Sequence, residues 1–273
     1  MDSQMLARLE HENMVETFVV VGGQAPGALV RRADGVALIA TGLPLRVFNQ
    51  VIVEGDSVAP EAIAAAVFTT RARGDRFVVN LRAGTDDRYL PLMAELDLVP
   101  LSADPWMPGM AYHPLPAPGT LAPAPGHEIR RVTDGPGVRD HILTAAAGFE
   151  MPVEWVEAIM SEAVAARPEA TVYVGYTDGE PVSTGLGIRT GRTIGIYNIA
   201  TLEAARRRGY GAAMTMRIVD DGAADGCDVA ILQASDMGRP IYERLGFRTV
   251  VEYVGYVDRA SLEPEPNAAP AAG

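Results

Sequence analysis

The sequence contains no lysine, and all 23 of its basic residues are arginines. This absence excludes catalysis through a lysine Schiff base, a lysine-bound pyridoxal phosphate and the lysine of a P-loop. The single cysteine, Cys227, cannot form a disulfide within the chain or a cysteine-rich zinc site. Whatever chemistry the chain performs must therefore use other side chains.

Long apolar runs are also missing. No run approaches the roughly 18 apolar residues of a membrane span, and no charged segment followed by an apolar one opens the chain. We therefore expect a cytoplasmic protein with no membrane partner. The net charge of −12 opposes non-specific binding to nucleic acid, so any phosphate site has to be local.

The length of 273 residues and the hydrophobic content of 48% fit two ordinary packed domains. Five prolines fall within residues 114–125, where they block both helix and central strand. This run predicts a linker over 114–126, between domains at 1–113 and 127–258. Residues 259–273 have little to bury and are predicted to be a disordered tail.

Residues 1–113 show a mixture of helical and strand patterns. Apolar spacing predicts a helix over 5–18, followed by a strand at 18–21. Two strands are expected within 28–41, around a turn at 33–35, and another strand at 47–53. Pro60 at a first helical position predicts a helix over 60–73, before a strand at 77–81 and a helix at 86–96. The segment is mixed α/β, and no catalytic motif is visible in it.

Residues 127–258 show a clearer alternation. We expect a strand at 128–132, helices at 137–149 and 152–166, and strands at 171–176, 181–189 and 193–200 joined by short glycine-containing turns. A helix at 209–224, a strand at 229–232, a helix at 238–245 and strands near 247 and at 251–257 follow. The predicted order is β-αα-βββ-α-β-α-ββ.

A candidate phosphate site lies where the strand at 193–200 gives way to a helix. Three arginines precede Gly209 and Gly211, which open a helix with an apolar stripe. Glycine lets the backbone approach a ligand closely, and the free N–H groups of the first helical turn attract anions. The junction suits a pyrophosphate. A basic turn on a solvated surface, without a ligand, can have the same sequence pattern.

This junction resembles the acyl-CoA signature of the GNAT N-acetyltransferases, which runs Arg or Gln, two residues, Gly, one residue, then Gly or Ala. Here the pattern is Arg206-x-x-Gly209-x-Gly211. The element order of 127–258 is also that of the family, and 235–247 resembles its second cofactor-side motif, which ends in Tyr-x-x-Leu-Gly-Phe. The resemblance implies an α/β (α+β) protein whose second half has the GNAT fold, with a mixed, mostly antiparallel sheet and splayed fourth and fifth strands.

The resemblance also implies an activity and a set of site residues. The activity is acyl transfer from acetyl-CoA, or another short acyl-CoA, to a primary amine by direct attack, without a metal. Tyr242 matches the tyrosine that protonates the departing thiolate in the family, and packing beside Leu245 is its alternative role. The residues implied in cofactor binding are Ile199, Ala200, Thr201, Arg206, Arg207, Arg208, Gly209, Tyr210, Gly211, Ala212 and Ser235.

The sequence departs from the family at two places. Ser235 stands where the family often has asparagine, so it offers the cofactor fewer hydrogen bonds. Many relatives carry a general-base glutamate on the fourth strand, where this chain has Tyr197 and Asn198. The base must then be a water chain or a residue from elsewhere. Glu150, between the two helices expected to line the acceptor groove, is one candidate, with a solvated loop residue as the alternative.

Residues 1–113 resemble, in length and position, the degenerate GNAT-like half of tandem GNAT proteins. Nothing like Arg-x-x-Gly-x-Gly occurs before residue 120. We expect this half to lack the cofactor motif, to pack against the second half and to shape its acceptor side. A homodimer is left open by the sequence.

Other interpretations compete with this one. A non-catalytic acyl-CoA-binding or sensing module would share the phosphate turn and would not need the missing carboxylate. A Rossmann domain needs a glycine-rich turn after the first strand of a parallel sheet, and the antiparallel hairpins before Arg206 argue against it. His127 and His141 lack partners at metal-ligand spacing. Trp106 either covers the acceptor groove or packs a proline-rich corner.

Overall fold

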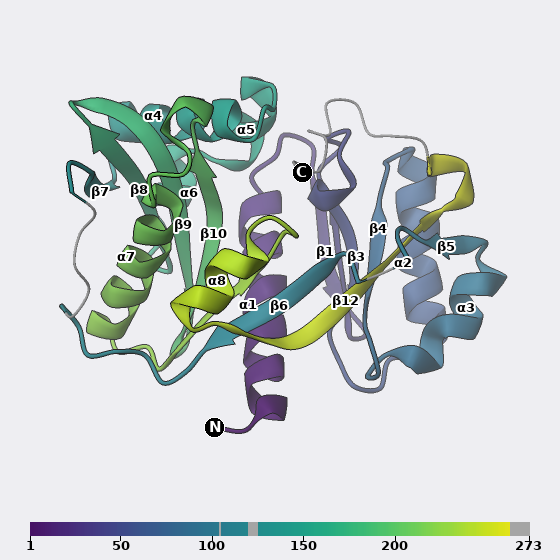
Figure 1. The fold of residues 1–273 in the computed structure, drawn as a ribbon. Helices are drawn as coiled ribbons and strands as arrows, with labels where there is room; N and C mark the ends of the chain where they lie inside the picture. The colour runs from purple at the N-terminus through teal and green to yellow at the C-terminus, as the bar shows by residue number, and fades with distance from the viewer. Residues whose placement is uncertain (104, 120–124, 263–273) are drawn as a thin grey trace.

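The computed structural model describes residues 1–103, 105–119 and 125–262. The predicted tail beyond residue 262 and residues 120–124 of the predicted linker lie outside the described residues. In the described part of the chain, twelve strands form one sheet in the order β1-β2-β3-β4-β12-β6-β11-β10-β9-β8-β7, and β5 pairs with β12. Helices cover both faces of this sheet, which confirms the predicted α/β class (Figure 1).

The first segment of the chain begins with a long helix and continues as a mixed α/β unit. The predicted strand at 18–21 is wrong, because these residues form the last turn of the first helix. Val20 is buried there, and such packing outweighs the β propensity of the valine run. The elements are α1 (Ser3–Gly22), β1 (Leu29–Ala33), β2 (Val36–Ala40), β3 (Asn49–Val53), α2 (Pro60–Arg73), β4 (Val78–Arg82), α3 (Leu90–Glu95), β5 (Leu98–Pro100) and β6 (Met107–Tyr112).

The second segment follows the predicted order with two differences. The expected helix at 152–166 is broken at Met160, whose backbone is extended (φ −122°, ψ 124°) and whose side chain is buried. The two expected last strands are one strand with a register shift between Thr249 and Val251. The elements are β7 (Glu128–Val132), α4 (Gly135–Gly148), α5 (Val153–Ile159), α6 (Glu162–Ala165), β8 (Ala170–Thr177), β9 (Glu180–Thr190), β10 (Thr193–Thr201), α7 (Tyr210–Ala224), β11 (Val229–Gln233), α8 (Arg239–Leu245) and β12 (Arg248–Asp258).

Strands β6 and β12 join the two segments. β6 comes from the first segment but lies between β11 and β12 of the second, and β12 continues outward to pair with β4 and β5. Figure 1 shows these two strands crossing the middle of the molecule in front of α1. The domain boundaries at residues 113 and 127 stay a prediction. Strands β6 and β12 each pair with strands of the other segment, across these boundaries.

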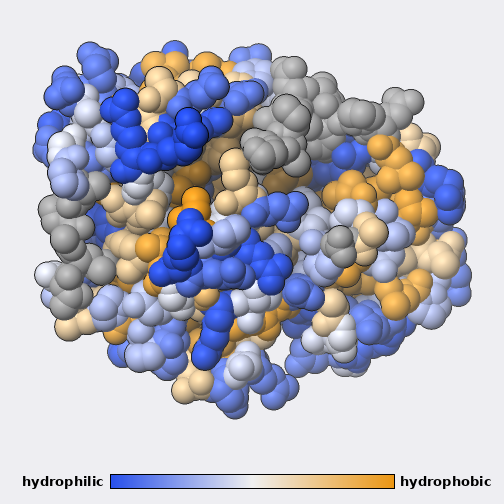
Figure 2. Space-filling model, in the orientation of Figure 1, coloured by the Kyte–Doolittle hydropathy of each residue, from blue (hydrophilic) through white to orange (hydrophobic). Residues whose placement is uncertain are grey.

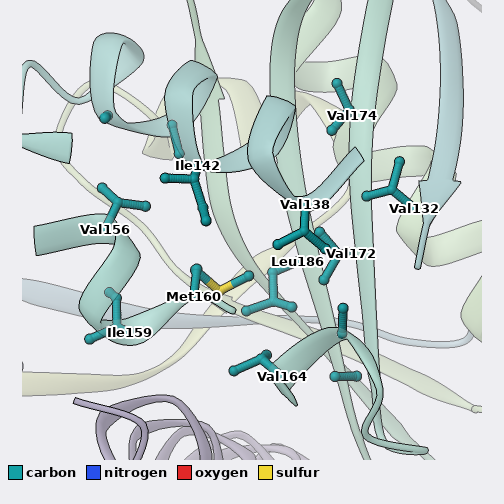
Figure 3. Packing of buried hydrophobic residues seen from close by; sticks show 14 of the residues in the cluster. Val132, Val138, Ile142, Val156, Ile159, Met160, Val164, Val172, Val174 and Leu186 are labelled. Carbon is teal, nitrogen blue, oxygen red and sulfur yellow. The ribbon is translucent and has the colours of Figure 1, made fainter. Parts of the chain in front are cut away.

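The two faces of the sheet carry different helices. On β8, Val172 and Val174 pack with α4 to α6, as Figure 3 shows, while Tyr173 between them packs with α7. On β2, Leu38 packs with α2 and Ile39 with α1. Because side chains alternate along a strand, α1 and α4 to α6 cover one face. Helices α2, α3, α7 and α8 cover the other.

Helix α1 crosses both halves and carries buried polar side chains toward the sheet. Asn13 is fully buried: its Nδ2 donates to Ile188 O (2.9 Å) and Thr190 Oγ1 (2.8 Å), and its Oδ1 accepts from the Tyr197 hydroxyl (2.8 Å). A Cβ on Gly195 would lie 1.9 Å from Asn13 Oδ1, so only glycine leaves room for this contact. These bonds fix α1 against β9 and β10.

A second buried cluster lies one turn earlier on α1. Glu10 Oε1 accepts from Gln233 Nε2 (2.5 Å), and Glu10 Oε2 accepts from the Tyr253 hydroxyl (2.7 Å). That hydroxyl also lies 2.9 Å from His11 Nδ1. Burial raises the pKa of the Glu10 carboxyl to about 7 and lowers the pKa of the His11 imidazole to about 4.

Replacing Asn13 by Ala leaves the buried Ile188 carbonyl, the half-buried Thr190 hydroxyl and the Tyr197 hydroxyl without this partner. We expect the free energy of unfolding to fall by about 3 kcal/mol, the order of such unpaired groups. Urea unfolding followed by circular dichroism measures this. The control is Gln24→Ala, which removes one bond of 3.3 Å to Val20 O within the same helix. Equal stability of the two variants would contradict the role given to Asn13.

Replacing Glu10 by Gln should make stability less sensitive to alkaline pH. The folded pKa of Glu10 is raised from 4.5 to about 7, so its contribution is present at low pH and lost as pH rises toward 7. Between about pH 5.5 and pH 8, the wild type should lose about 2 kcal/mol relative to Glu10→Gln. Urea unfolding of both proteins across this range gives the difference, and a constant difference would show that Glu10 does not titrate there.

Candidate functional site

Strands β10 and β11 pair in parallel at one end and then separate. The pairs join Thr193–Gly195 to Val229–Ile231, and no further pair forms between these strands in the described residues. Asn198, with φ +52°, lies within an irregularity of the β9–β10 pairing, and its carbonyl accepts from Thr184 Oγ1 (2.8 Å). The predicted splay is therefore present, and Ile199–Thr201 present an edge that β11 does not cover.

The predicted phosphate turn closes the open end of β10. Arg207 (φ +63°) and Gly209 (φ +81°) alternate with neighbours of ordinary conformation, and Gly209 is the N-cap of α7. A Cβ built on Gly209 meets none of the described atoms within 4 Å, so the side facing solvent is open. No side-chain cap is present among the described residues. The first N–H groups of α7 are thus available to an anion.

The arginines of this turn have different roles. Arg206 turns inward, donating to Gly148 O (3.0 Å) and Thr201 O (3.3 Å), and pairs with Glu150 (3.6 Å). Arg206 therefore ties the end of β10 to the end of α4. Arg207 and Arg208 are exposed and can reach phosphate oxygens.

Tyr210 and Ala212 lie in the first turn of α7. The Tyr210 ring stacks on His127 at 4.1 Å and is buried. Only the backbone of Tyr210 is therefore placed for ligand contact. Gly211 faces the end of β10, because a Cβ there would lie 3.7 Å from both Ile199 Cγ2 and Thr201 Oγ1.

Tyr242 lies on α8 beside the first turns of α7. Its ring packs on Phe247 at 6.0 Å, and Thr215 of α7 lies near its hydroxyl. Burial raises the pKa of the Tyr242 phenol, partly offset by Thr215, so the hydroxyl keeps its proton at neutral pH. Ser235 leads into the same helix, where its Oγ accepts from Gly238 N (3.2 Å).

The predicted residues converge at one end of α7. Ile199 and Tyr242 pack against the same apolar cluster, and Gly211 faces Ile199 and Thr201, since a Cβ there would lie 3.7 Å from both. In Figure 2, hydrophilic surface gathers over the upper end of α7 and over α8, with hydrophobic surface between them. This arrangement suits a ligand with a charged head and an apolar arm.

Several other candidates have structural roles. Glu150 is exposed and pairs with Arg206 (3.6 Å) at the end of β10. Trp106 donates from Nε1 to Asn80 Oδ1 (3.1 Å) and packs in the core, which is the packing role. Among the described residues, no cluster of histidine, cysteine, aspartate and glutamate side chains could hold a metal. No helix there is long and apolar enough to cross a membrane.

The opposite face of the gap contains a residue that sequence reasoning missed. Tyr197 of β10 and Gln233 of β11 are half-buried, and behind them lies the fully buried carboxyl of Glu10. The available signal was the spacing of Leu6, Glu10, Asn13 and Thr17, which places polar residues on the apolar face of one helix. A carboxylate therefore stands near the gap although β10 has none.

The corresponding strand-to-helix junction of the first half is built differently. Between β3 and α2, Glu54 and Asp56 stand in a turn without Arg-x-x-Gly-x-Gly. The buried Tyr89 hydroxyl bonds both Val58 N (2.8 Å) and Val58 O (2.9 Å). This turn is thus acidic, and a side chain of the first half itself satisfies its backbone.

Comparisons with known proteins agree with this geometry. Residues 137–238 match the family model described as acetyltransferase (GNAT) domain. A GCN5-related N-acetyltransferase from Kribbella flavida has a TM-score of 0.67 at 18% identity, covering 93% of this chain and 95% of its own. One from Sphaerobacter thermophilus has a TM-score of 0.59 at 17% identity, covering 95% of both chains.

A tandem GNAT protein from the clavulanic acid biosynthesis pathway is also similar. Its TM-score is 0.59 at 13% identity, with 94% of this chain and 96% of that chain covered. No curated protein matches the sequence. Residues 137–238 are therefore similar to a GNAT acetyltransferase domain, and the chain as a whole has the fold of the tandem GNAT proteins.

Proposed function

We propose that the protein transfers an acetyl group from acetyl-CoA to a primary amine by direct attack in a ternary complex. The observation that carries the proposal is the convergence of three features at one end of α7. These are the uncovered edge of β10, the glycine turn with its exposed arginines, and the Tyr242 hydroxyl. Each supplies a different part of acyl transfer.

The binding part of the proposal uses the backbone. The pantetheine arm lies along Ile199, Ala200 and Thr201 as an added strand, since this edge has no partner on β11. The pyrophosphate lies on the N–H groups of the turn and of the start of α7, from Arg207 to Ala212, with the side chains of Arg207 and Arg208 beside it. Arg206 holds the turn through its own bonds, and Ser235 keeps its hydroxyl near α8.

The chemical part follows from the same placement. Acetyl-CoA supplies an acetyl group activated as a thioester. Backbone N–H groups of β10 stabilise the negative charge that develops on the carbonyl oxygen. Tyr242 then gives its proton to the departing sulfur, for which its raised pKa keeps it protonated.

A non-catalytic acyl-CoA sensor is the alternative function, because β10 has no carboxylate to accept the amine proton. A panel of amines distinguishes the two: a linear polyamine, an arylalkylamine, an amino sugar and a peptide N-terminus. The enzyme releases free CoA with at least one of them. A sensor binds acetyl-CoA and releases no CoA above the hydrolytic background.

Changing Gly209 and Gly211 together to Leu should abolish acetyl-CoA binding. Side chains there occupy the space into which the pyrophosphate must fit. Calorimetry should show one acetyl-CoA per wild-type chain and an affinity weakened by roughly 100-fold or more, about 2.8 kcal/mol, in the variant. The control is Gly226→Leu, a glycine of similar φ (+85°) and similar open space at the other end of α7. Binding that survives in the double variant would remove the turn from the site.

Replacing Tyr242 by Phe should lower turnover by roughly 100-fold and leave acetyl-CoA affinity unchanged, because only the proton for the sulfur is lost. Steady-state release of CoA with the best amine of the panel measures turnover, and calorimetry measures acetyl-CoA affinity. Tyr112→Phe is the control, because the Tyr112 ring packs on the same Phe247 at 5.4 Å. Unchanged turnover in Tyr242→Phe would exclude Tyr242 as the acid.

A further inference from the structure

The carboxyl of Glu10 is placed at the gap between β10 and β11 by three strands. Gln233, which donates to Glu10 Oε1, is the last residue of β11, and Gly109 of β6 pairs with it in register. A Cβ on Gly109 would lie 2.4 Å from Glu10 Oε1, so the carboxyl fills a space that glycine leaves open. Tyr197 faces the same side of the sheet from β10 and bonds Asn13, the next turn of α1. The carboxyl thus lies directly behind the two half-buried residues that line this face of the gap.

Burial of this carboxyl is costly, and the fold alone does not require it. An ionised carboxylate without water loses several kcal/mol of solvation. Its partners are Gln233 and Tyr253, with no arginine or lysine bonded to it in the described chain. A titratable group kept in such surroundings is typical of functional sites.

The hydrogen bonds around Glu10 allow it to hold or release a proton. His11 Nε2 lies 2.8 Å from Val53 O, which can only accept, so this nitrogen carries the hydrogen. Nδ1 is then an acceptor for the Tyr253 hydroxyl, and this leaves a protonated Glu10 to donate to Tyr253. When Glu10 is ionised, the Tyr253 hydrogen turns to Glu10 Oε2 instead. Glu10 therefore keeps its hydrogen bond to Tyr253 whether it is protonated or ionised, and the change requires only rotation of the Tyr253 hydroxyl.

We propose that Glu10, on the first helix of the chain, is the proton acceptor for the amine that attacks acetyl-CoA in the second half. The inference rests on the proposed function and assigns the base that β10 lacks. The amine nitrogen bonds to the thioester carbon, and its proton passes through water to Glu10. The carbon–sulfur bond then breaks, and the thiolate takes its proton from Tyr242.

The surroundings of Glu10 set the pH at which it acts. Its burial raises the carboxyl pKa to about 7, while Gln233, Tyr253 and the charge of Arg82 lower it. His11 stays neutral, since burial lowers its pKa to about 4, and burial raises the pKa of the Tyr197 phenol. His11 also borders a surface pocket with Val15 and Thr190.

The test is the pH profile of kcat at saturating acetyl-CoA, with the panel amine of highest turnover. The wild type should gain activity as pH rises through about 7. Glu10→Gln, which keeps the shape of the side chain, should lose roughly 100-fold in kcat together with this pH dependence. Acetyl-CoA affinity should stay unchanged. Glu12→Gln is the matched control, because Glu12 lies two residues along the same helix, is 55% exposed and pairs with Arg8.

Gln233→Leu keeps the test decisive if Glu10→Gln does not fold. It leaves the carboxyl in place and removes a donor that lowers its pKa, so the rise in kcat should move to higher pH. Difference infrared spectroscopy of wild type and Glu10→Gln should also show one carboxyl titrating near pH 7, independently of any amine.

The outcomes separate the inference from the proposed function. A wild type that releases CoA with the panel, with unchanged pH profiles in both Glu10→Gln and Gln233→Leu, overturns the role of Glu10 alone. A wild type that binds acetyl-CoA and acetylates no amine overturns the proposed function, and the role of Glu10 with it.

Discussion

The short parallel pairing of β10 with β11 is the constraint on which the rest of the structure depends. The two strands share three residue pairs, after which their edges separate. β11 cannot move to close the gap, because its other edge is held by β6 over four pairs, and β6 is held in turn by β12. β10 is fixed from its own other side by β9, with which it resumes pairing after the irregularity at Asn198. The gap therefore results from strand pairing elsewhere in the sheet. Within the residues that the structure describes, it leaves backbone N–H and C=O groups of β10 and β11 without partners across it, and a ligand can supply those hydrogen bonds.

The two faces of this gap are built from different parts of the chain. The face of α7 and α8 is open, basic and rich in free backbone N–H groups, all within the second half. The face of α1 is closed and carries neutral or proton-exchanging side chains that come from both halves. The proposed mechanism uses this division, since the anionic acetyl-CoA binds on the α7 face and the amine must reach its thioester carbon from another direction. The arginines do not compete with the buried carboxyl, because Arg206 is already bonded to Gly148 and Thr201.

Features set by neighbouring residues, such as helix ends and turns, could be predicted from the sequence. Strands whose pairing partners are distant in the sequence were missed or divided. The helix at 60–73 was recognisable because Pro60 opens it and Gly74, with φ +76°, ends it. The junction at Arg206–Gly211 was recognisable because one short pattern carries the conformations that it needs. β6 was missed because Pro108 and Gly109 are unfavourable in a central strand, and the side chains of Glu10 and Val251, which leave no room for a Cβ at Gly109, explain that glycine. β12 was divided in two because its register shift interrupts the apolar alternation, and its length is set by partners in the other half.

The first half lacks the Arg-x-x-Gly-x-Gly turn and supplies structural parts to the second half. Its junction after β3 is acidic and filled by Tyr89. Its last strand, β6, holds β11 in place, and its first helix presents Glu10 and Asn13 to β11 and β10. In the proposed mechanism, the buried Glu10 carboxyl of α1 takes the role of the carboxylate that β10 lacks. The first half places side chains behind the gap, where the Tyr253 hydroxyl and the Gln233 amide offset part of the cost of burying the Glu10 carboxyl. The proposed site therefore uses both halves, although the recognisable motif lies in one.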